Sequence, residues 1–258
     1  MGISEVVQSF MDEEKSGTKF LLQATWDDVP HLSQEQKDKL WASIPPFQRD
    51  ARAKGIPQLG AGAIYPVDEE LLLVDDFEIP EHWPKWYGMD VGWNWTAAVW
   101  FALDRDSGTT YIWSTYKAGN AEPLIHAGAI KARGEWIKGA IDYAGTNQTD
   151  GTRVMTVYEE CGLNVDKANK SVEAGLYKVW QEKTLGTLKV FKSASTQYLA
   201  EQRLYRRNEK GKIVKDNDHI MDAERYGMMA EDSIKTTKPL PKEPQRNNLN
   251  QGPTGWMG

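Results

Sequence analysis

The chain has 258 residues, of which 40% are apolar and 26% are charged, a composition that is ordinary for a soluble globular protein and includes no apolar run long enough to span a bilayer. Its net charge of −6 argues against a protein held to nucleic acid by bulk charge, although a local basic patch remains compatible with it. The single cysteine, Cys161, excludes an internal disulfide and a cysteine-based zinc site, and it fits a reducing cytoplasm.

The first 66 residues are predicted to form short helices and loops that lead into a linker. Ser33 and Gln36 give a capping-box pattern at the start of a helix that runs to about Ser43. A shorter helix follows and ends at Gly55, and residues 55–66 are rich in Gly and Pro. We therefore expect residues 1–66 to be distinct from a folded unit that begins at about residue 67.

A strand, a tight turn and a hairpin are predicted between Trp86 and Thr115. The strand ends on Asp90, and the next two strands, 96–103 and 109–115, are rich in aromatic and β-branched residues. The connection between them carries Asp and Gly, which are typical of turns. These three strands should pair antiparallel.

Helices and strands alternate over the remainder of the folded unit. The predicted elements are a helix at 121–133, a strand at 136–141, a helix at 152–161, an extended piece at 163–165, a helix at 171–183, a strand at 188–191, a helix at 193–205, a basic hairpin at 206–215 and a helix at 218–230. Residues from 233 onward are almost devoid of apolar side chains, which predicts a disordered tail. The order indicates an α/β protein with a mixed sheet: three antiparallel strands, then alternating helices and parallel strands, flanked by helices.

Acidic residues stand at three matching positions of this predicted fold. Asp90 and Asp142 each end a buried strand, where sites of α/β sheets gather, and Asp218 and Asp222 lie four residues apart on one face of a helix start. Carboxylates this close repel one another unless a cation lies between them. Hard oxygen ligands favour Mg²⁺ or Mn²⁺, and two such ions roughly 3.5–4 Å apart can support phosphodiester cleavage.

Each acidic position also has an ordinary structural interpretation. Asp90 could accept backbone N–H groups in a turn, and Asp218 with Asp222 could form a solvated helix start. The coincidence of three acidic positions favours the metal site. His219 lies off the face of the two helical acids, so we expect it to support the ligands and not to bind the ion itself.

A basic stretch runs directly into the last helix. It could contact phosphates beside the acidic residues and so position a duplex without reading its sequence, or it could be a solvated hairpin; the sequence leaves both interpretations open. The candidate DNA-binding residues are Arg203, Arg206, Arg207, Lys210, Lys212 and Lys215.

The order of elements and the acidic positions resemble the ribonuclease H-like nuclease fold, and three motifs resemble the large terminase subunit of tailed bacteriophages. The motifs are GMDVGWNWTAA around Asp90, AIDYAG around Asp142 and NDHIMDAERYG from Asn217 to Gly227. The segment from residue 25 to 67 is similar to the one that links the ATPase of that family to its nuclease. The resemblance covers roughly residues 2–230.

The resemblance implies a metal-dependent endonuclease that cuts concatemeric double-stranded viral DNA during genome packaging by two-metal-ion hydrolysis. Asp90, Asp142 and Asp218 would be the catalytic metal ligands, with Asp222 as a neighbouring ligand and two Mg²⁺ or Mn²⁺ ions as cofactors. The partners would be double-stranded DNA, the portal protein, the small terminase subunit and the ATPase domain of the same motor. The protein would act in the host cytoplasm and be absent from the mature virion.

The same resemblance divides the chain into three parts. Residues 1–66 would be a helical remnant from the end of the ATPase domain, residues 67–232 the nuclease domain, and residues 233–258 a disordered tail. No P-loop pattern G-x-x-x-x-G-K-S/T occurs, so this chain alone is not expected to hydrolyse ATP.

Two other functions compete with the nuclease. A non-catalytic docking module of the packaging motor would not need acidic residues at strand and helix ends, although both roles can coexist. An actin-like ATPase shares the strand-plus-hairpin pattern, but it requires two such domains and a second Gly-rich nucleotide motif, both of which this sequence lacks.

Overall fold

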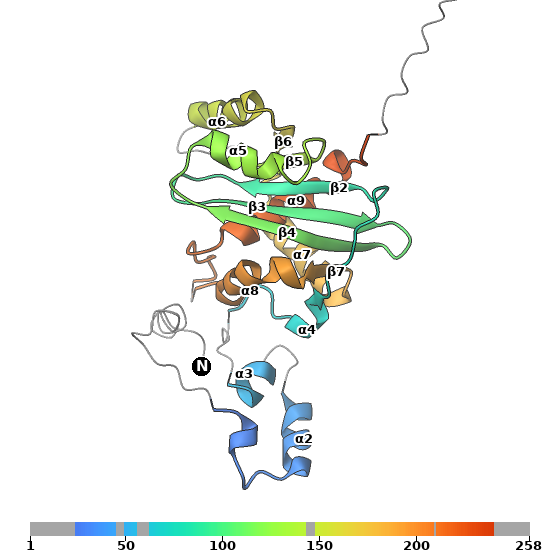
Figure 1. The fold of residues 1–258 in the computed structure, drawn as a ribbon. Coiled ribbons are helices and arrows are strands. Elements are labelled where there is room, and N and C mark those ends of the chain that lie inside the picture. Colours follow the sequence, from blue (N-terminus) through green and yellow to red (C-terminus); the bar gives the residue numbers. More distant parts are fainter. Residues whose placement is uncertain (1–23, 45–48, 56–61, 143–147, 209, 240–258) are drawn as a thin grey trace, which may run out of the picture.

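Seven strands form one mixed sheet in the order β1-β7-β4-β3-β2-β5-β6 in the computed structural model, which describes residues 24–44, 49–55, 62–142, 148–208 and 210–239 (Figure 1). The strands are β1 Leu73–Val74, β2 Lys85–Asp90, β3 Thr96–Asp104, β4 Thr109–Ala118, β5 Lys138–Ile141, β6 Val165–Lys167 and β7 Leu188–Phe191. Strands β2, β3 and β4 pair antiparallel, whereas β1, β5, β6 and β7 join the sheet by parallel pairing. The predicted α/β mixed sheet is confirmed.

Helices cover both faces of the sheet (Figure 1). The described helices are η2 Trp26–Asp28, α2 Gln34–Ser43, α3 Arg49–Ala53, α4 Glu69–Leu72, α5 Pro123–Lys131, α6 Gln148–Glu160, α7 Val172–Leu185, η4 Lys192–Ala194, α8 Ser195–Leu204 and α9 His219–Ile234. Helices α5 and α6 pack on one face, and α7, α8 and α9 on the other. None of these described helices has the length and apolar character needed to cross a membrane.

The two cores follow from the alternation of side chains along the central strands. Trp86 and Phe101 point to the α9 side and stack on each other, whereas Tyr87 and Trp100 point to the α5 side. Seven consecutive residues of β3 are buried, as expected for a strand at the centre of a sheet that is covered on both faces.

The folded unit extends beyond both of its predicted boundaries. In the predicted linker, Ile64 N donates to Tyr205 O at 3.0 Å, and Tyr65 is buried in the core. At the other end, α9 continues to Ile234, and Lys85 and Thr236 exchange two backbone hydrogen bonds of 2.8 and 3.1 Å. The first residues assigned to the tail are therefore ordered, because they complete the sheet edge. The helix expected before residue 24 and the tail after residue 239 lie outside the described residues.

Helix α9 lies unusually close to β2 because two glycines face each other. A Cβ atom at Gly88 would stand 2.0 Å from the carbonyl oxygen of Ala223 and 2.4 Å from the nitrogen of Gly227. Trp86 Nε1 donates to Gly227 O at 3.0 Å, which fixes the contact. This approach brings the start of α9 to the end of β2, where Asp90 stands.

Candidate functional site

Four carboxylates meet at one edge of the sheet. Strands β2 and β5 pair in parallel with Met89 opposite Ile141, so Asp90 and Asp142 follow side by side where these strands end. Helix α9 begins at the same edge, with Asp218 just before it and Asp222 in its first turn, and both of these residues are buried. The three acidic positions of the sequence thus converge in space.

Asp90 and Asp142 each bind side chains that are remote in sequence. Asp90 Oδ2 lies 2.9 Å from His219 Nδ1. Asp142 Oδ1 lies 2.7 Å from Lys170 Nζ, and its Oδ2 accepts a hydrogen bond of 3.0 Å from the Tyr226 hydroxyl. Each acid at a strand end is therefore held by at least one cationic or hydroxyl group from another element.

Asp218 and Asp222 share one lysine. Lys215 Nζ lies 2.8 Å from Asp218 Oδ2 and donates to Asp222 Oδ2 at 2.6 Å. The other oxygen of Asp222 accepts hydrogen bonds from Arg225 Nη2 at 3.0 Å and from the Tyr205 hydroxyl at 3.3 Å. Asp222 is thus restrained on both of its oxygens.

The clustering changes the protonation equilibria of the site. Burial raises the pKa of Asp90, the hydrogen bond from His219 opposes this effect, and the nearby charges of Asp222 and Asp142 add to it. The hydrogen bond to Asp90 raises the pKa of His219 against the opposing effect of its burial. Burial lowers the pKa of Lys215, but the charges of Asp222 and Asp218 outweigh it, so the net pKa is raised and the ammonium stays charged.

The donor set suits a hard divalent cation. Carboxylate oxygens are the ligands that Mg²⁺ and Mn²⁺ prefer, and Asp218 Oδ2 is buried without a hydrogen-bond partner in the described structure, its contact with Lys215 being an ion pair. In the described residues no group of three or more His, Cys, Asp and Glu side chains is placed to hold a metal ion. Instead, each of the four carboxylates faces a protein cation.

Glu201 of α8 is a supporting residue that the sequence patterns did not single out. Its Oε2 accepts the backbone N–H of Ile220 at 2.7 Å, and its Oε1 pairs with Lys117 Nζ at 2.7 Å. Because Ile220 lies in the first turn of α9, this buried carboxylate satisfies a free N–H there and fixes the helix start beside Asp218. A carboxylate on the buried face of a predicted helix was the available signal. Lys170 and Tyr226 were also missed.

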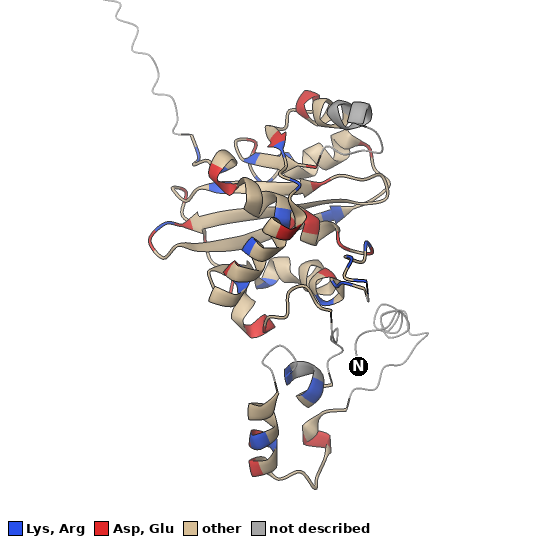
Figure 2. Cartoon of the chain, turned by 180° about the vertical axis from the view of Figure 1, so that it is seen from behind, with Lys and Arg blue, Asp and Glu red and all other residues tan. Residues whose placement is uncertain are grey.

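The predicted DNA-binding residues divide into two groups. Arg203 makes a bidentate pair with Glu69, with two contacts of 2.6 Å, Arg207 pairs with Glu173 at 2.7 Å, and Lys215 lies in the acidic cluster. Lys210 and Lys212 are exposed and Arg206 is half-buried. Figure 2 shows Lys and Arg interspersed with Asp and Glu along the described elements. DNA contact by this stretch stays a prediction.

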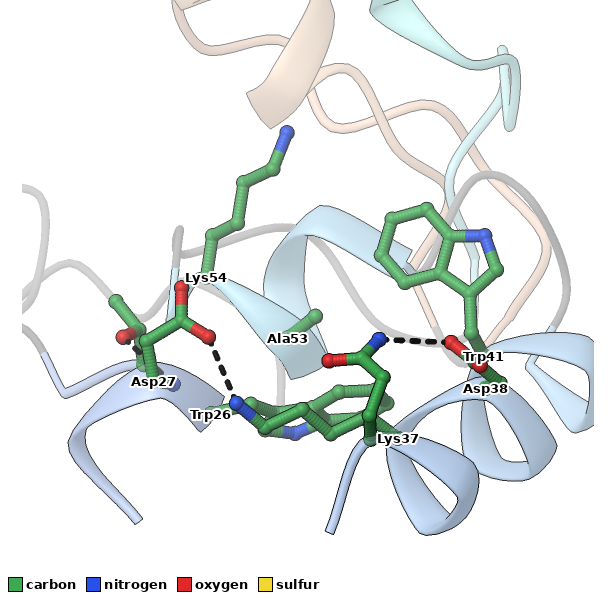
Figure 3. Close-up of a pocket in the computed structure, with 9 residues that line it drawn as sticks. Trp26, Asp27, Lys37, Asp38, Trp41, Ala53 and Lys54 are labelled. Atoms are coloured by element: carbon green, nitrogen blue, oxygen red, sulfur yellow. Dashed lines mark hydrogen bonds and ion pairs between the residues drawn. The ribbon is translucent and has the colours of Figure 1, made fainter. Parts of the chain in front are cut away.

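A separate pocket of about 370 Å³ lies between η2, α2 and α3 (Figure 3). Trp26 and Trp41 form its aromatic walls, and an ion pair of 2.8 Å joins Lys37 to Asp27 at its rim. The four clustered carboxylates do not line it. The candidate site is therefore the acidic edge of the sheet.

Sequence comparison relates the chain to the large terminase subunits of two phages. It is 34% identical over 241 residues to the large subunit of Salmonella phage P22 terminase and 33% identical over 241 residues to that of Enterobacteria phage LP7. These alignments cover 89% of this chain but only 48% and 50% of the relatives, so the chain spans about half the length of the curated relatives it matches.

Structural comparison gives the same relationship. The nuclease domain of the P22 large terminase matches with a TM-score of 0.63 and 30% identity, covering 68% of this chain and 95% of that domain. The large terminase of a thermophilic bacteriophage matches with a TM-score of 0.56 and 20% identity over 87% of this chain and 59% of its own, which supports the fold. The terminase RNaseH-like domain family matches residues 87–231, a range that includes all four clustered carboxylates, and the chain belongs to that family.

Proposed function

We propose that this chain is the nuclease part of a phage large terminase and that it cuts concatemeric double-stranded viral DNA during genome packaging. The observation that carries the proposal is the convergence of Asp90, Asp142 and the Asp218–Asp222 pair at one sheet edge. Membership of the terminase RNaseH-like domain family supports the same activity.

Two bound Mg²⁺ or Mn²⁺ ions would complete the site, with Asp90, Asp142, Asp218 and Asp222 as the residues that hold them. Such ions activate a water molecule and stabilise the leaving oxygen of a phosphodiester. The protein's contribution is orientation: His219 holds Asp90, and Tyr226 holds Asp142. Partners of this kind fix ligand geometry, and their loss typically costs 10- to 100-fold in affinity or activity, as an order of magnitude.

Phosphate contacts would hold the duplex at this edge. Net charge of −6 opposes DNA, so local basic side chains are needed. Arg206, Lys210 and Lys212 are the members of the basic stretch that best suit this role, because Arg203 and Arg207 already pair with carboxylates. The contact would be independent of sequence, as a packaging nuclease requires.

The remaining proposals concern the whole motor. The ATPase domain, the portal protein and the small terminase subunit would be partners, and the host cytoplasm would be the location. Residues 1–66 would belong to the connection with the ATPase domain, and residues 67–232 to the nuclease domain, to which the segment that begins at Gly62 is added because it pairs with the strand-like residues 205–207. Residues 233–258 would be a tail whose described start pairs with the sheet.

A docking role can coexist with catalysis. Leu124 and Ile125 in α5 are exposed, as are Tyr177 and Leu185 in α7. Large apolar side chains in solvent are common at protein–protein contacts, although isolated ones are ordinary. A protein that only docks would have no cleavage activity, so one assay separates the two functions.

That assay is nicking of supercoiled plasmid with Mn²⁺, with Mg²⁺ and with EDTA. Wild type should nick only with a divalent ion, and Asp90→Asn or Asp142→Asn should reduce nicking to the level seen with EDTA while circular dichroism stays unchanged. Asp106→Asn is the matched control, because this exposed aspartate lies in the β3–β4 turn at the opposite edge of the sheet. Full activity of either site variant, or no nicking by wild type, would show that the proposal is wrong.

A further inference from the structure

Lys215 bridges two buried carboxylates in the way a divalent cation would. Its Nζ lies 2.8 Å from Asp218 Oδ2 and 2.6 Å from Asp222 Oδ2. One ammonium thus compensates two negative charges that would otherwise repel each other across a single helical turn. The same two oxygens are the ones that a metal ion in this cluster would need.

The oxygens of Asp222 differ in how firmly they are held. Its Oδ1 binds Arg225 and Tyr205, both of which are buried almost completely. Its Oδ2 binds Lys215, whose side chain is 60% exposed. The Oδ2 side, shared with Asp218, is therefore the side on which the counter-ion can be exchanged.

Lys215 is suited to leave. It precedes α9 in a non-helical segment in which Asn217 has a φ of 51°, and its long side chain reaches the acids from solvent. Exposed lysine–carboxylate pairs contribute little because the ammonium regains hydration and rotamer freedom on release. A divalent ion offers twice the charge to the same oxygens.

We propose that Lys215 is an internal counter-ion that positions Asp218 and Asp222 in the free protein and competes with the divalent cation for them. The inference rests on the proposed function for the identity of the competing ion. Lys215 is accordingly a positioning residue and not a phosphate contact in the metal-free state. Removing its charge should strengthen metal binding, whereas removing a phosphate-binding lysine should not.

The test measures Mn²⁺ binding to the full chain without DNA, by calorimetry and by electron paramagnetic resonance of the free ion. Lys215→Met should bind Mn²⁺ about 3- to 10-fold more tightly than wild type, the range expected when one or two exposed ion pairs no longer have to be broken. Lys215→Arg, which keeps the charge, should stay close to wild type. Lys192→Met is the matched control, because Lys192 is also 60% exposed and pairs with a single carboxylate, Asp75, at 2.7 Å.

A second readout is thermal unfolding. In EDTA, Lys215→Met should unfold at a lower temperature than wild type, since Asp218 and Asp222 lose their shared counter-ion, and saturating Mn²⁺ should remove this difference. Unchanged or weaker Mn²⁺ affinity of Lys215→Met, with wild type still nicking plasmid, would overturn this inference and leave the proposed function intact. Absence of both Mn²⁺ binding and nicking in wild type would overturn the proposed function and this inference with it.

Discussion

Gly88→Ala should disconnect the two halves of the acidic site. The added Cβ would lie 2.0 Å from the carbonyl oxygen of Ala223, whereas ordinary contact begins at 3.4 Å, so α9 would have to retreat by about 1.4 Å. Backbone stands on both sides of this contact, so no flexible side chain can absorb the overlap. Asp218 and Asp222 would move with α9, while Asp90 would stay on the sheet.

The expected magnitudes follow from this displacement. Overpacking of a well-packed core costs about 1–3 kcal/mol, and loss of the hydrogen bond from Trp86 to Gly227 adds about 1 kcal/mol. The free energy of unfolding should therefore fall by about 2–4 kcal/mol. Misplacement of catalytic groups by about 1 Å can reduce the rate of an enzyme roughly 100-fold, so nicking should decrease by that order even where the variant is folded.

Urea unfolding followed by circular dichroism measures the first quantity, and Mn²⁺-dependent plasmid nicking measures the second. Gly128→Ala is the matched control, because Gly128 lies on the exposed side of α5 with no neighbour within 4 Å of the added Cβ. It should stabilise the protein by about 0.5–1 kcal/mol and leave nicking unchanged. If Gly88→Ala kept both wild-type stability and wild-type nicking, close approach of α9 to β2 would not be what assembles the site.

Two other parts of the molecule give quantitative tests. Lys183 and Glu224 form a fully buried pair at 2.9 Å, so Lys183→Met should cost about 3–5 kcal/mol in urea unfolding, and adding Glu224→Gln should recover much of it; an undiminished loss in the double variant would contradict the pairing argument. Burial lowers the pKa of Lys183 to about 8, so the unfolded chain retains this proton at pH values where the folded protein has released it, and the stability advantage of wild type over Lys183→Met should grow from about pH 8 to pH 10 rather than stay constant. Replacing three basic residues with Ala should lower the slope of log DNA affinity against log salt by roughly 0.9 for each phosphate that the variant no longer binds, measured by fluorescence anisotropy on unrelated duplexes, and unchanged binding at every salt concentration would place the duplex elsewhere; the residues are Arg206, Lys210 and Lys212.

The fold was predictable where the local pattern is strong. The predicted hairpin strands and the strand at 188–191 agree with β3, β4 and β7, because long alternating or β-branched runs favour one structure. Strand β1 was not predicted because it has two residues and exists only through parallel pairing with β7. The predicted end of the last helix was four residues early, because burial of Ile234 against the core extends α9 through a polar stretch.

The site was predictable to the level of its acidic residues and no further. A carboxylate that ends a buried strand is visible in the sequence, and so is a pair four residues apart on a helix. The partners of these acids were not visible: Tyr226 meets Asp142 only because α9 crosses β2 and β5. Arg203 was assigned to DNA for its charge, yet the short helix α4 places Glu69 beside it.

Exposure of the counter-ions decides which carboxylate oxygens a metal ion can reach. A buried partner cannot leave without stranding a charge in the interior, so Arg225, which is 2% exposed, commits Asp222 Oδ1 to the protein. Lys170 and Lys215 are 37% and 60% exposed, and each can return to water at little cost. These two lysines cover Asp142 Oδ1 and the Oδ2 atoms of Asp218 and Asp222. The acidic helix residues therefore need not be alternatives, because both offer an exchangeable oxygen on the side of Lys215.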